Sequence, residues 1–513
     1  MRNLAVVGLL AIILAGCISW KPFTSEQKPE LSATLRHPIR EARGVWLHRF
    51  EYCNYTSTFD QDSIRQYIRQ VIQRAAEANF NIIFFQVRGN GDAYYTPGLE
   101  PWGNLLTGAL GEDPGWDPLQ FAIREAHKYG LELHAWLNTF PAWRGTTPPP
   151  ESTPRLAILE HPEWVVCDSS GTPMPYSGHY VSLSPGIPAV HDHIISVVTD
   201  IIRRYDIDGI HFDYIRYPED APDHGYSHDS ISVARYNSVS GNPFDFGWED
   251  WQRAQLNQFV YKAYNAITTA DSGIKMSAAV IGAYETGTWN AYRVVYQDPR
   301  RWTEMEKIDF VVPMTYWENA HPTHSFVKLT REWQDRYIID RPVFPGIGSY
   351  RFVPENELDW SEAEKQIAHL RKRNIPGMVF FDAQSLMDHW EKLGTGLFQF
   401  PALLPQMPWK KSSRPDPVSD LNISLHGDRI ELTWNPPAAL TTADSSSIHR
   451  LLIYVSTAAP MDRLDRKNLL AVIPGDTTRW WLQLDGNMPE SGTVGISVMN
   501  RSYQESRLTV RQL

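Results

Sequence analysis

The chain has 513 residues, more than one ordinary domain needs and enough for a large barrel with a smaller module. Its formal net charge is −11 and it has no cluster of basic residues, so nucleic-acid binding is disfavoured. The chain also contains 19 Trp and 23 Tyr. A large core accounts for some of these rings, but exposed ones can serve as stacking platforms for sugars.

Residues 1–16 are predicted to be a targeting segment. Arg2 precedes the apolar run Leu4–Leu14, which is too short to cross a bilayer as a mature helix. The run ends in Leu14-Ala-Gly-Cys17, which resembles a bacterial lipobox and implies cleavage before Cys17 and lipidation of its thiol. Residues 17–36 would form a tether. We therefore expect a membrane lipoprotein, placed on the periplasmic face of the outer membrane.

Two further cysteines, Cys53 and Cys167, follow the targeting segment. An exported protein can form a disulfide, but the sequence leaves open whether these two residues meet. Two isolated cysteines argue against a disulfide framework or a cysteine-based zinc site.

Eight apolar runs alternate with helical patterns across residues 37–408. The runs are nearly continuous, as in strands that are buried on both faces. Eight such repeats predict an α/β fold, a TIM (β/α)8 barrel with insertions. The predicted strands are Arg43–His48, Asn81–Arg88, Leu131–Asn138, Gly209–Arg216, Lys275–Gly282, Phe310–Trp317, Val343–Tyr350 and Met378–Gln384.

Five helical patterns between these runs are clear from their apolar stripes and caps. The longest insertions, Asn138–Pro188 and Pro218–Phe246, follow strands and should shape a cleft at the catalytic face. The predicted helices are Ser63–Asn79, Pro118–Tyr129, Val190–Tyr205, Trp251–Thr268 and Ser361–Arg373.

Residues 409–417 have the composition of a linker, and residues 418–513 carry short alternating strands. This pattern predicts a β-sandwich. Its motifs resemble a fibronectin type III domain, in which Trp434 would be a core residue. The predicted strands are Ser419–Leu425, Arg429–Trp434, His449–Ser456, Leu469–Val472, Arg479–Leu484, Gly492–Met499 and Arg507–Arg511.

Polar and aromatic residues recur where the predicted barrel strands end. The most informative stretch is Asp208-Gly-Ile-His-Phe-Asp-Tyr-Ile-Arg-Tyr-Pro218, an apolar run that delivers Asp213. Catalytic groups of TIM barrels lie at the carboxyl ends of the strands. Asp213 is therefore the first candidate for catalysis.

These motifs resemble the glycosyl-hydrolase-like ten family over roughly residues 40–400. The resemblance implies an exported TIM barrel, often a lipoprotein, that hydrolyses a cell-envelope glycan such as peptide-free peptidoglycan strands. The matching motifs are Arg43-Gly-Val-Trp46, Gln86-Val-Arg88, Asp92-Ala-Tyr94, His134-Ala-Trp-Leu-Asn138, Asp208–Pro218 and Pro313-Met-Thr-Tyr316.

A more distant likeness links Asp208–Asp213 to the strand-four motif of chitinase-type glycosidases. The position of the chitinase acid is Ile215 here, and His211 replaces the middle Asp. The substrate-assisted mechanism of those enzymes therefore does not carry over.

Glycoside hydrolysis usually needs two carboxyl groups that flank the bond. We assign Asp213 as the first carboxyl, which would be the nucleophile if the enzyme is retaining, and Glu285 as the general acid, its pKa raised by neighbouring aromatic rings. The alternatives are a structural Asp213 paired with Arg43 or Arg88, and a solvated Glu285. Asp92 and Asp382 are the reserve carboxyls.

The remaining residues at the strand ends are predicted to contact the substrate. No cofactor is expected and no metal site is predicted. The predicted contacts are Trp46, Arg88, Asp92, Tyr95, His134, Trp136, Asn138, His211, Arg216, Tyr316, Trp317 and Asp382.

Three alternatives stay open. One is a metal-dependent hydrolase or deacetylase that uses His134, His211 and Asp213. Another is a lipoprotein that binds a glycan without cleaving it, and the third is a purely structural envelope protein. The sequence leaves open the sugar, the linkage and the anomeric outcome.

Overall fold

The structure is a computed structural model that describes residues 38–54, 59–219, 221–353, 356, 358–410, 412–437, 448–458, 460–483 and 492–513. The predicted targeting segment, lipidation at Cys17 and all of the predicted tether fall outside these residues. Within the described part of the chain, no helix has both the length and the apolar character needed to cross a membrane.

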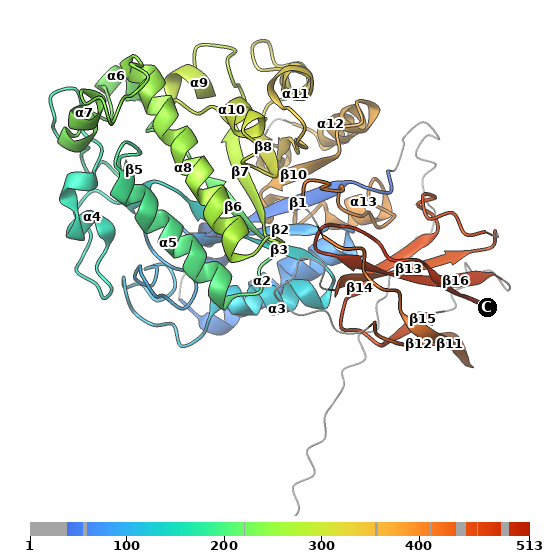
Figure 1. The fold of residues 1–513 in the computed structure, drawn as a ribbon. Helices are drawn as coiled ribbons and strands as arrows, with labels where there is room; N and C mark the ends of the chain where they lie inside the picture. The colour runs from blue at the N-terminus through green and yellow to red at the C-terminus, as the bar shows by residue number, and fades with distance from the viewer. Residues whose placement is uncertain are drawn as a thin grey trace, which may run out of the picture.

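Eight parallel strands form a barrel, as predicted, with helices around it (Figure 1). The hydrogen-bonded order is β8-β7-β6-β3-β2-β1-β10-β9, and a parallel bridge from Val311 to Val343 joins the two ends. The strands are β1 (Ala42–Leu47), β2 (Ile82–Arg88), β3 (Glu132–Asn138), β6 (Gly209–Asp213), β7 (Lys275–Ile281), β8 (Phe310–Met314), β9 (Gly346–Gly348) and β10 (Gly377–Phe381).

Seven of these strands begin within one residue of the predicted start, and β9 lies inside its predicted range. The seventh is the exception in length, because β9 has only three residues where Val343–Tyr350 was predicted. Pro345 directly precedes β9 and has no N–H to donate to the ladder, which accounts for the late start.

The five predicted helices are all present, with ends shifted by a few residues. In α2 the Asp60 side chain caps the first turn by accepting from the Ser63 N–H, and the apolar stripe from Ile64 to Ala76 is buried. The helices are α1 (Arg49–Asn54), α2 (Gln61–Glu77), α3 (Pro118–Lys128), α4 (Ala157–Glu160), α5 (Pro188–Arg204), α6 (Ala221–His224), α7 (Ser230–Tyr236), α8 (Trp248–Ala270), α9 (Ala291–Val294), α10 (Pro299–Glu304), α11 (Phe326–Glu332), α12 (Ser361–Lys372) and α13 (Trp390–Thr395), with the short turns η1 (Pro162–Trp164), η2 (Trp333–Tyr337), η3 (Ser349–Phe352) and η4 (Gln384–Leu386).

The long insertion after β3 contains a two-stranded antiparallel sheet. Its strands are β4 (Pro141–Arg144) and β5 (Tyr180–Ser182). The insertion after β6 contains α6 and α7. Both insertions begin at the carboxyl ends of strands, so they build on the face where β6 delivers Asp213.

The C-terminal region is an all-β domain of two antiparallel sheets with a shared core. Trp434 is buried in that core, as predicted. The fibronectin type III resemblance stays a prediction. The sheets are β11-β12-β15 and β14-β13-β16-β17, made of β11 (Ser419–His426), β12 (Arg429–Asn435), β13 (Ile448–Ser456), β14 (Leu469–Pro474), β15 (Arg479–Gln483), β16 (Thr493–Asn500) and β17 (Thr509–Gln512).

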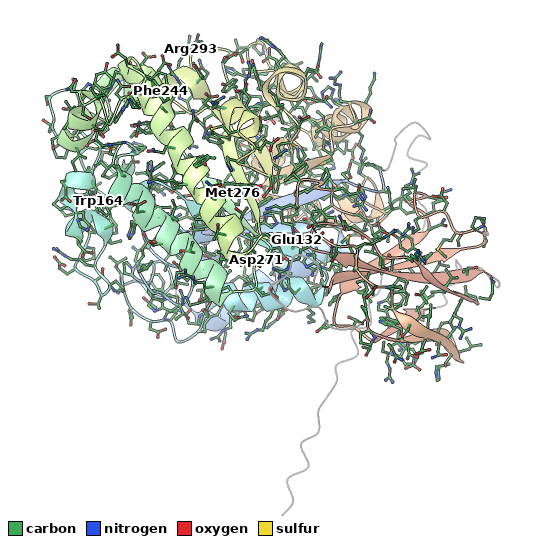
Figure 2. All side chains as sticks on the ribbon, in the orientation of Figure 1. Glu132, Trp164, Phe244, Asp271, Met276 and Arg293 are labelled. Atoms are coloured by element: carbon green, nitrogen blue, oxygen red, sulfur yellow. The ribbon has the colours of Figure 1, made fainter. Side chains whose placement is uncertain are left out.

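A buried network of charges joins this domain to the amino end of the barrel. Glu132 opens β3 and accepts hydrogen bonds from Lys275 Nζ at 3.0 Å, His449 Nε2 at 3.0 Å and the Tyr503 hydroxyl at 2.8 Å. Figure 2 places Glu132 where the two domains meet. Burial opposes ionisation of Glu132, but Lys275 and the hydrogen bonds from His134 and His449 hold its pKa well below the ordinary value. Burial lowers the pKa of Lys275, and the charge of Glu132 opposes that shift, so each charge favours the other.

The predicted linker also packs against the barrel. Trp409 Nε1 and Lys410 Nζ both bond the carboxylate of Asp309, at 2.7 and 2.9 Å. Cys53 and Cys167 are both buried and free.

Removing the carboxylate at the centre of the network should destabilise the protein. Glu132→Gln leaves Lys275 without its counter-charge in a buried site, and we expect a loss of about 3–5 kcal/mol of unfolding free energy in chemical denaturation. Glu163→Gln, which breaks an exposed pair with His161, is the control and should cost less than about 0.5 kcal/mol. Equal losses of unfolding free energy in both variants would show that the buried network stabilises the protein no more than an exposed ion pair does.

Candidate functional site

A cavity of about 200 Å³ opens at the carboxyl end of the barrel strands. Six of the predicted site residues line it: Trp46, Trp136, Asn138, Asp213, Arg216 and Tyr316. Further walls come from His48, Arg49, Phe50, Gln86, Tyr180, Tyr214, Ala279, Met314 and Phe381. Aromatic rings and a few polar groups are the usual lining of a ligand site.

Asp213 is the last residue of β6, and its side chain is 9% exposed. Its Oδ1 accepts from the Tyr214 N–H at 2.6 Å and from Arg216 Nη1 at 3.2 Å. No described residue donates to Oδ2. One oxygen therefore holds the carboxyl in place and the other is available to a ligand in the cavity.

The backbone turns sharply just after Asp213. Tyr214 has φ +55°, a left-handed conformation that a residue with a bulky side chain rarely adopts. This turn brings the Arg216 guanidinium over the Tyr214 ring at 3.9 Å. The strained turn places both the N–H and the guanidinium against Oδ1.

Burial raises the pKa of Asp213 above its ordinary value, and Arg216 and the Tyr214 N–H offset only part of that effect. The alternative to a catalytic Asp213 was a structural role, in which its carboxylate pairs with Arg43 or Arg88. Arg43 instead pairs with Glu41, and Arg88 pairs with Glu100 at 2.7 Å.

Asp382 lies behind the cavity wall beside His48 and Phe381, both of which line the cavity. His48 Nε2 is 3.1 Å from Asp382 Oδ2, and Ser385 N–H donates to Oδ1 at 3.0 Å. Burial would raise the pKa of Asp382, but the hydrogen bonds from His48 and Ser385 lower it below the ordinary value.

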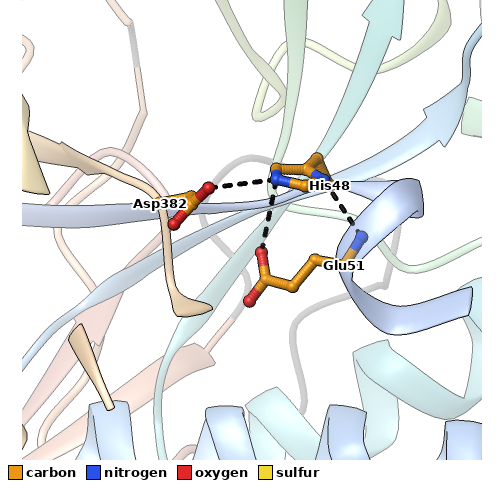
Figure 3. A group of neighbouring side chains, drawn as sticks. All are labelled: His48, Glu51 and Asp382. Carbon is orange, nitrogen blue, oxygen red and sulfur yellow. Dashed lines mark hydrogen bonds and ion pairs between the residues drawn. The ribbon is translucent and has the colours of Figure 1, made fainter. Parts of the chain in front are cut away.

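Figure 3 shows a second carboxyl, Glu51, which faces the same ring nitrogen of His48 as Asp382 does. Glu51 Oε2 is 3.8 Å from His48 Nε2, and Oε1 accepts from the Tyr67 hydroxyl at 2.7 Å. Burial raises the pKa of Glu51 well above its ordinary value, and the charge of Asp382 adds to this. Asp382 is therefore the ionised member of this pair and Glu51 the neutral one.

His48, Glu51 and Asp382 are close enough together to be considered as metal ligands. The tautomer of His48 argues against this. Its Nδ1 accepts the Glu51 backbone N–H at 3.1 Å, so the ring proton must be on Nε2, the nitrogen that faces both carboxyls. A metal ligand at Nε2 would need that proton removed.

The metal-dependent alternative built on His134, His211 and Asp213 is wrong. His134 Nε2 bonds Glu132 at the amino end of the barrel. His211 Nε2 accepts from Trp46 Nε1 at 3.0 Å, and its Nδ1 is 2.8 Å from Ser277 Oγ. The described residues that could share a metal do not include these three. Neither histidine lines the cavity, so their contact with substrate stays a prediction that the cavity does not support.

Glu285 does not suit the role of general acid. Its side chain is exposed and lies outside the cavity lining. Tyr284 turns away from it, since its hydroxyl donates to Asp298 at 2.6 Å. The neighbouring rings therefore do not enclose the carboxyl, because they belong to the outer helical layer.

Four other predicted contacts also lie outside the cavity lining. Arg88 is buried against Glu100, and Tyr95 is buried behind the same pair. Asp92 accepts the N–H groups of the turn after β2. Trp317 stacks on His324 at 4.7 Å. These residues follow strand ends, as predicted, but their side chains bond or pack with other residues around the cavity and do not line it.

A larger cavity of about 520 Å³ lies between the barrel and the C-terminal domain. It is lined by Tyr129, Trp480 and Trp481 among others, and none of its described lining residues carries a carboxyl or an imidazole. The smaller cavity, which contains Asp213, is therefore the candidate active site.

A model of the family described as glycosyl hydrolase-like 10 matches residues 41–361. The chain belongs to this family. Glycosyl hydrolase YngK of Bacillus subtilis (strain 168) is 27% identical over 406 residues, 73% of this chain and 75% of that protein. Glycosyl hydrolase DigH of Escherichia coli (strain K12) is 27% identical over 393 residues, 70% of this chain and 86% of that protein.

A solved structure, the glycoside hydrolase domain of PgaB (BpsB) from Bordetella bronchiseptica, superposes with a TM-score of 0.49 at 15% identity. It covers 69% of this chain and 98% of that domain.

The sequence reasoning missed Arg49, Phe50 and Tyr180 as cavity residues. Arg49 and Phe50 follow β1 directly, so their place after a strand end was a usable signal. Tyr180 comes from the insertion after β3, and no local pattern shows which part of a long insertion returns to the cavity.

The Arg216 charge should be measurable at Asp213. Arg216→Gln removes the cation that favours the ionised carboxyl, so the pKa of Asp213 should rise further. Titration of the carboxyl by ¹³C NMR, with Asp213→Asn to assign the signal, checks this. Arg144→Gln removes an exposed cation that makes no bond to Asp213 and should leave the pKa unchanged; a fall in Arg216→Gln would contradict the assignment.

Proposed function

We propose that this protein is a glycoside hydrolase that cleaves a bacterial cell-envelope glycan, namely peptide-free peptidoglycan strands. The observation that carries the proposal is Asp213, with one oxygen fixed and one free in an aromatic cavity at the barrel's catalytic end. Membership of the glycosyl hydrolase-like 10 family supports the reaction class. The motif resemblance supports the choice of glycan.

In this proposal Asp213 is the general acid. A carboxyl whose pKa is raised by burial can keep its proton for the leaving oxygen, and one whose pKa is lowered stays ionised. Asp382 is the ionised partner. This assignment differs from the one made from the sequence, in which Asp213 was the nucleophile and Glu285 the acid. Burial raises the pKa of the Tyr316 phenol, and the charges of Asp213 and Asp382 add to this.

The cavity walls supply the sugar contacts in this proposal. Trp46, Trp136 and Tyr316 offer ring faces, and the Asn138 amide lies among them. Flat rings that pack on the apolar face of a sugar exclude water from the bond to be cleaved.

We further propose that the chain is lipidated at Cys17 and faces the periplasm from the outer membrane. The lipobox resemblance supports this anchoring. The described barrel begins only at β1, which would leave the residues between Cys17 and Pro38 to span the distance from the membrane.

The direct test is mass spectrometry of products after incubation with peptide-free peptidoglycan strands. Asp213→Asn keeps the shape but loses the proton donor, so we expect turnover to fall by about 10²- to 10⁴-fold. Glu285→Gln is the matched control and should keep activity within about twofold, since an exposed loop carboxyl adds little. Binding without release of oligosaccharides by the wild type would favour a glycan-binding protein instead.

The pH profile tests the role of Asp382. His48→Leu removes a hydrogen bond that favours the ionised carboxylate, so the pKa of Asp382 should rise. The acidic limb of kcat/KM should then move to higher pH while the alkaline limb stays in place. An acidic limb that stays unchanged would remove Asp382 from the chemistry.

A further inference from the structure

Arg49 is a buried cation in the wall of the candidate active site. It is the first residue of α1, it lines the cavity, and it is 1% exposed. Its guanidinium lies over the Phe50 ring at 4.2 Å. A Cβ at position 89 would overlap this guanidinium, so Gly89 leaves the space that the cation occupies.

The guanidinium is only partly bonded. Nη2 donates to Asn90 Oδ1 at 2.9 Å and approaches the Tyr180 hydroxyl at 3.5 Å. Nε and Nη1 are buried and have no hydrogen-bond partner. Those two nitrogens carry three of the five N–H bonds of an arginine.

Arg49 also has no counter-ion. Within the described ranges, no carboxylate oxygen lies within 4.0 Å of its guanidinium. The nearby carboxylate of Asp92 is occupied by the N–H groups of Gly89 and Asn90 at 3.1 and 2.7 Å. The charge of Asp92 still favours the ionised guanidinium from beyond direct contact. It does not supply acceptors for Nε and Nη1, and buried N–H donors without acceptors are costly unless a ligand supplies them.

The other unsatisfied atom in the described cavity wall is of the same kind. Trp136 Nε1 is buried without a partner, and it too is an N–H donor. Gln86 and Asn138 do not supply the missing acceptors, because Gln86 Oε1 already accepts the Arg49 backbone N–H at 3.1 Å and Asn138 Oδ1 already accepts from Gln86 Nε2 at 3.1 Å. The wall therefore presents spare donors and a spare positive charge, which suits an anion rich in acceptors.

We propose that Arg49 binds a carboxylate on the sugar that occupies the cavity, so that the substrate is an acidic glycan. This rests on the proposed glycosidase function and deepens it. Arginine is the side chain best suited to carboxylates, and a guanidinium–carboxylate contact is stronger than a bond between neutral groups. Peptide-free peptidoglycan strands fit, because removal of the peptides frees a lactyl carboxylate on alternate sugars.

A matched pair of substrates tests the proposal with the full chain. One is the peptide-free strand, and the other is the same strand with its carboxyls converted to neutral methylamides. We expect the wild type to show kcat/KM about 10- to 100-fold higher on the acidic strand, the usual size of a charge-assisted hydrogen bond. Arg49→Gln should bring this ratio near one, and Arg49→Lys should keep part of it because the charge remains.

Arg144→Gln is the matched control, because Arg144 is an exposed arginine over the same Phe50 ring at 5.1 Å. It should keep the wild-type ratio within about threefold, as for an exposed charge. A wild-type ratio near one, or equal losses on both strands in Arg49→Gln, would overturn the proposal.

A binding arm separates this inference from the proposed function. With Asp213→Asn, calorimetric titration of acidic and methylamide oligosaccharides should show about 10-fold or more tighter binding of the acidic form, lost in the double variant with Arg49→Gln. If the wild type cleaves neither strand but the preference in binding persists, the hydrolase proposal fails and the carboxylate site stands. Equal binding of both forms would refute the carboxylate site whatever the turnover.

Discussion

The common direction of the eight barrel strands is the constraint on which the site depends. Parallel strands end at the same rim, so residues far apart in the chain meet there. Trp46 and His48 come from the end of β1, Asp213 from β6 and Asp382 from just after β10. Side chains alternate along a strand, so a one-residue slip of β6 would turn Asp213 away from the cavity.

Buried charges at the amino end of the barrel are paired, whereas those at the carboxyl end are only partly bonded. At the amino end, Glu132 is paired with Lys275 and is bonded by His449 and Tyr503 of the C-terminal domain. At the carboxyl end, Arg49 has two nitrogens without hydrogen-bond partners among the described residues, and Asp213 keeps an oxygen free. Full pairing stabilises the fold and holds the two domains together, whereas incomplete pairing leaves groups for a ligand.

The carboxyls near the cavity have different pKa values because their surroundings differ, not because their residue types differ. Asp213 and Glu51 are buried with few donors to their ionised forms, so the pKa of each is raised. Asp382 receives hydrogen bonds from His48 and Ser385, which outweigh burial. The same chemical group can thus hold a proton at one position and a charge a short distance away.

The strand and helix pattern by itself determined the barrel, the C-terminal β domain and the place of Asp213 at the end of a barrel strand, because apolar periodicity is a local property of the chain. It also placed Trp46, Trp136, Asn138, Arg216 and Tyr316 at the rim that the cavity occupies. Only the tertiary structure decided which way each rim side chain points. It turned Glu285, His134 and Arg88 away from the cavity and brought Arg49 and Tyr180 into it. The physical reason is that partners such as Glu100 and Glu132, and the return of the long insertion after β3, are set by packing between distant segments, which no local pattern encodes.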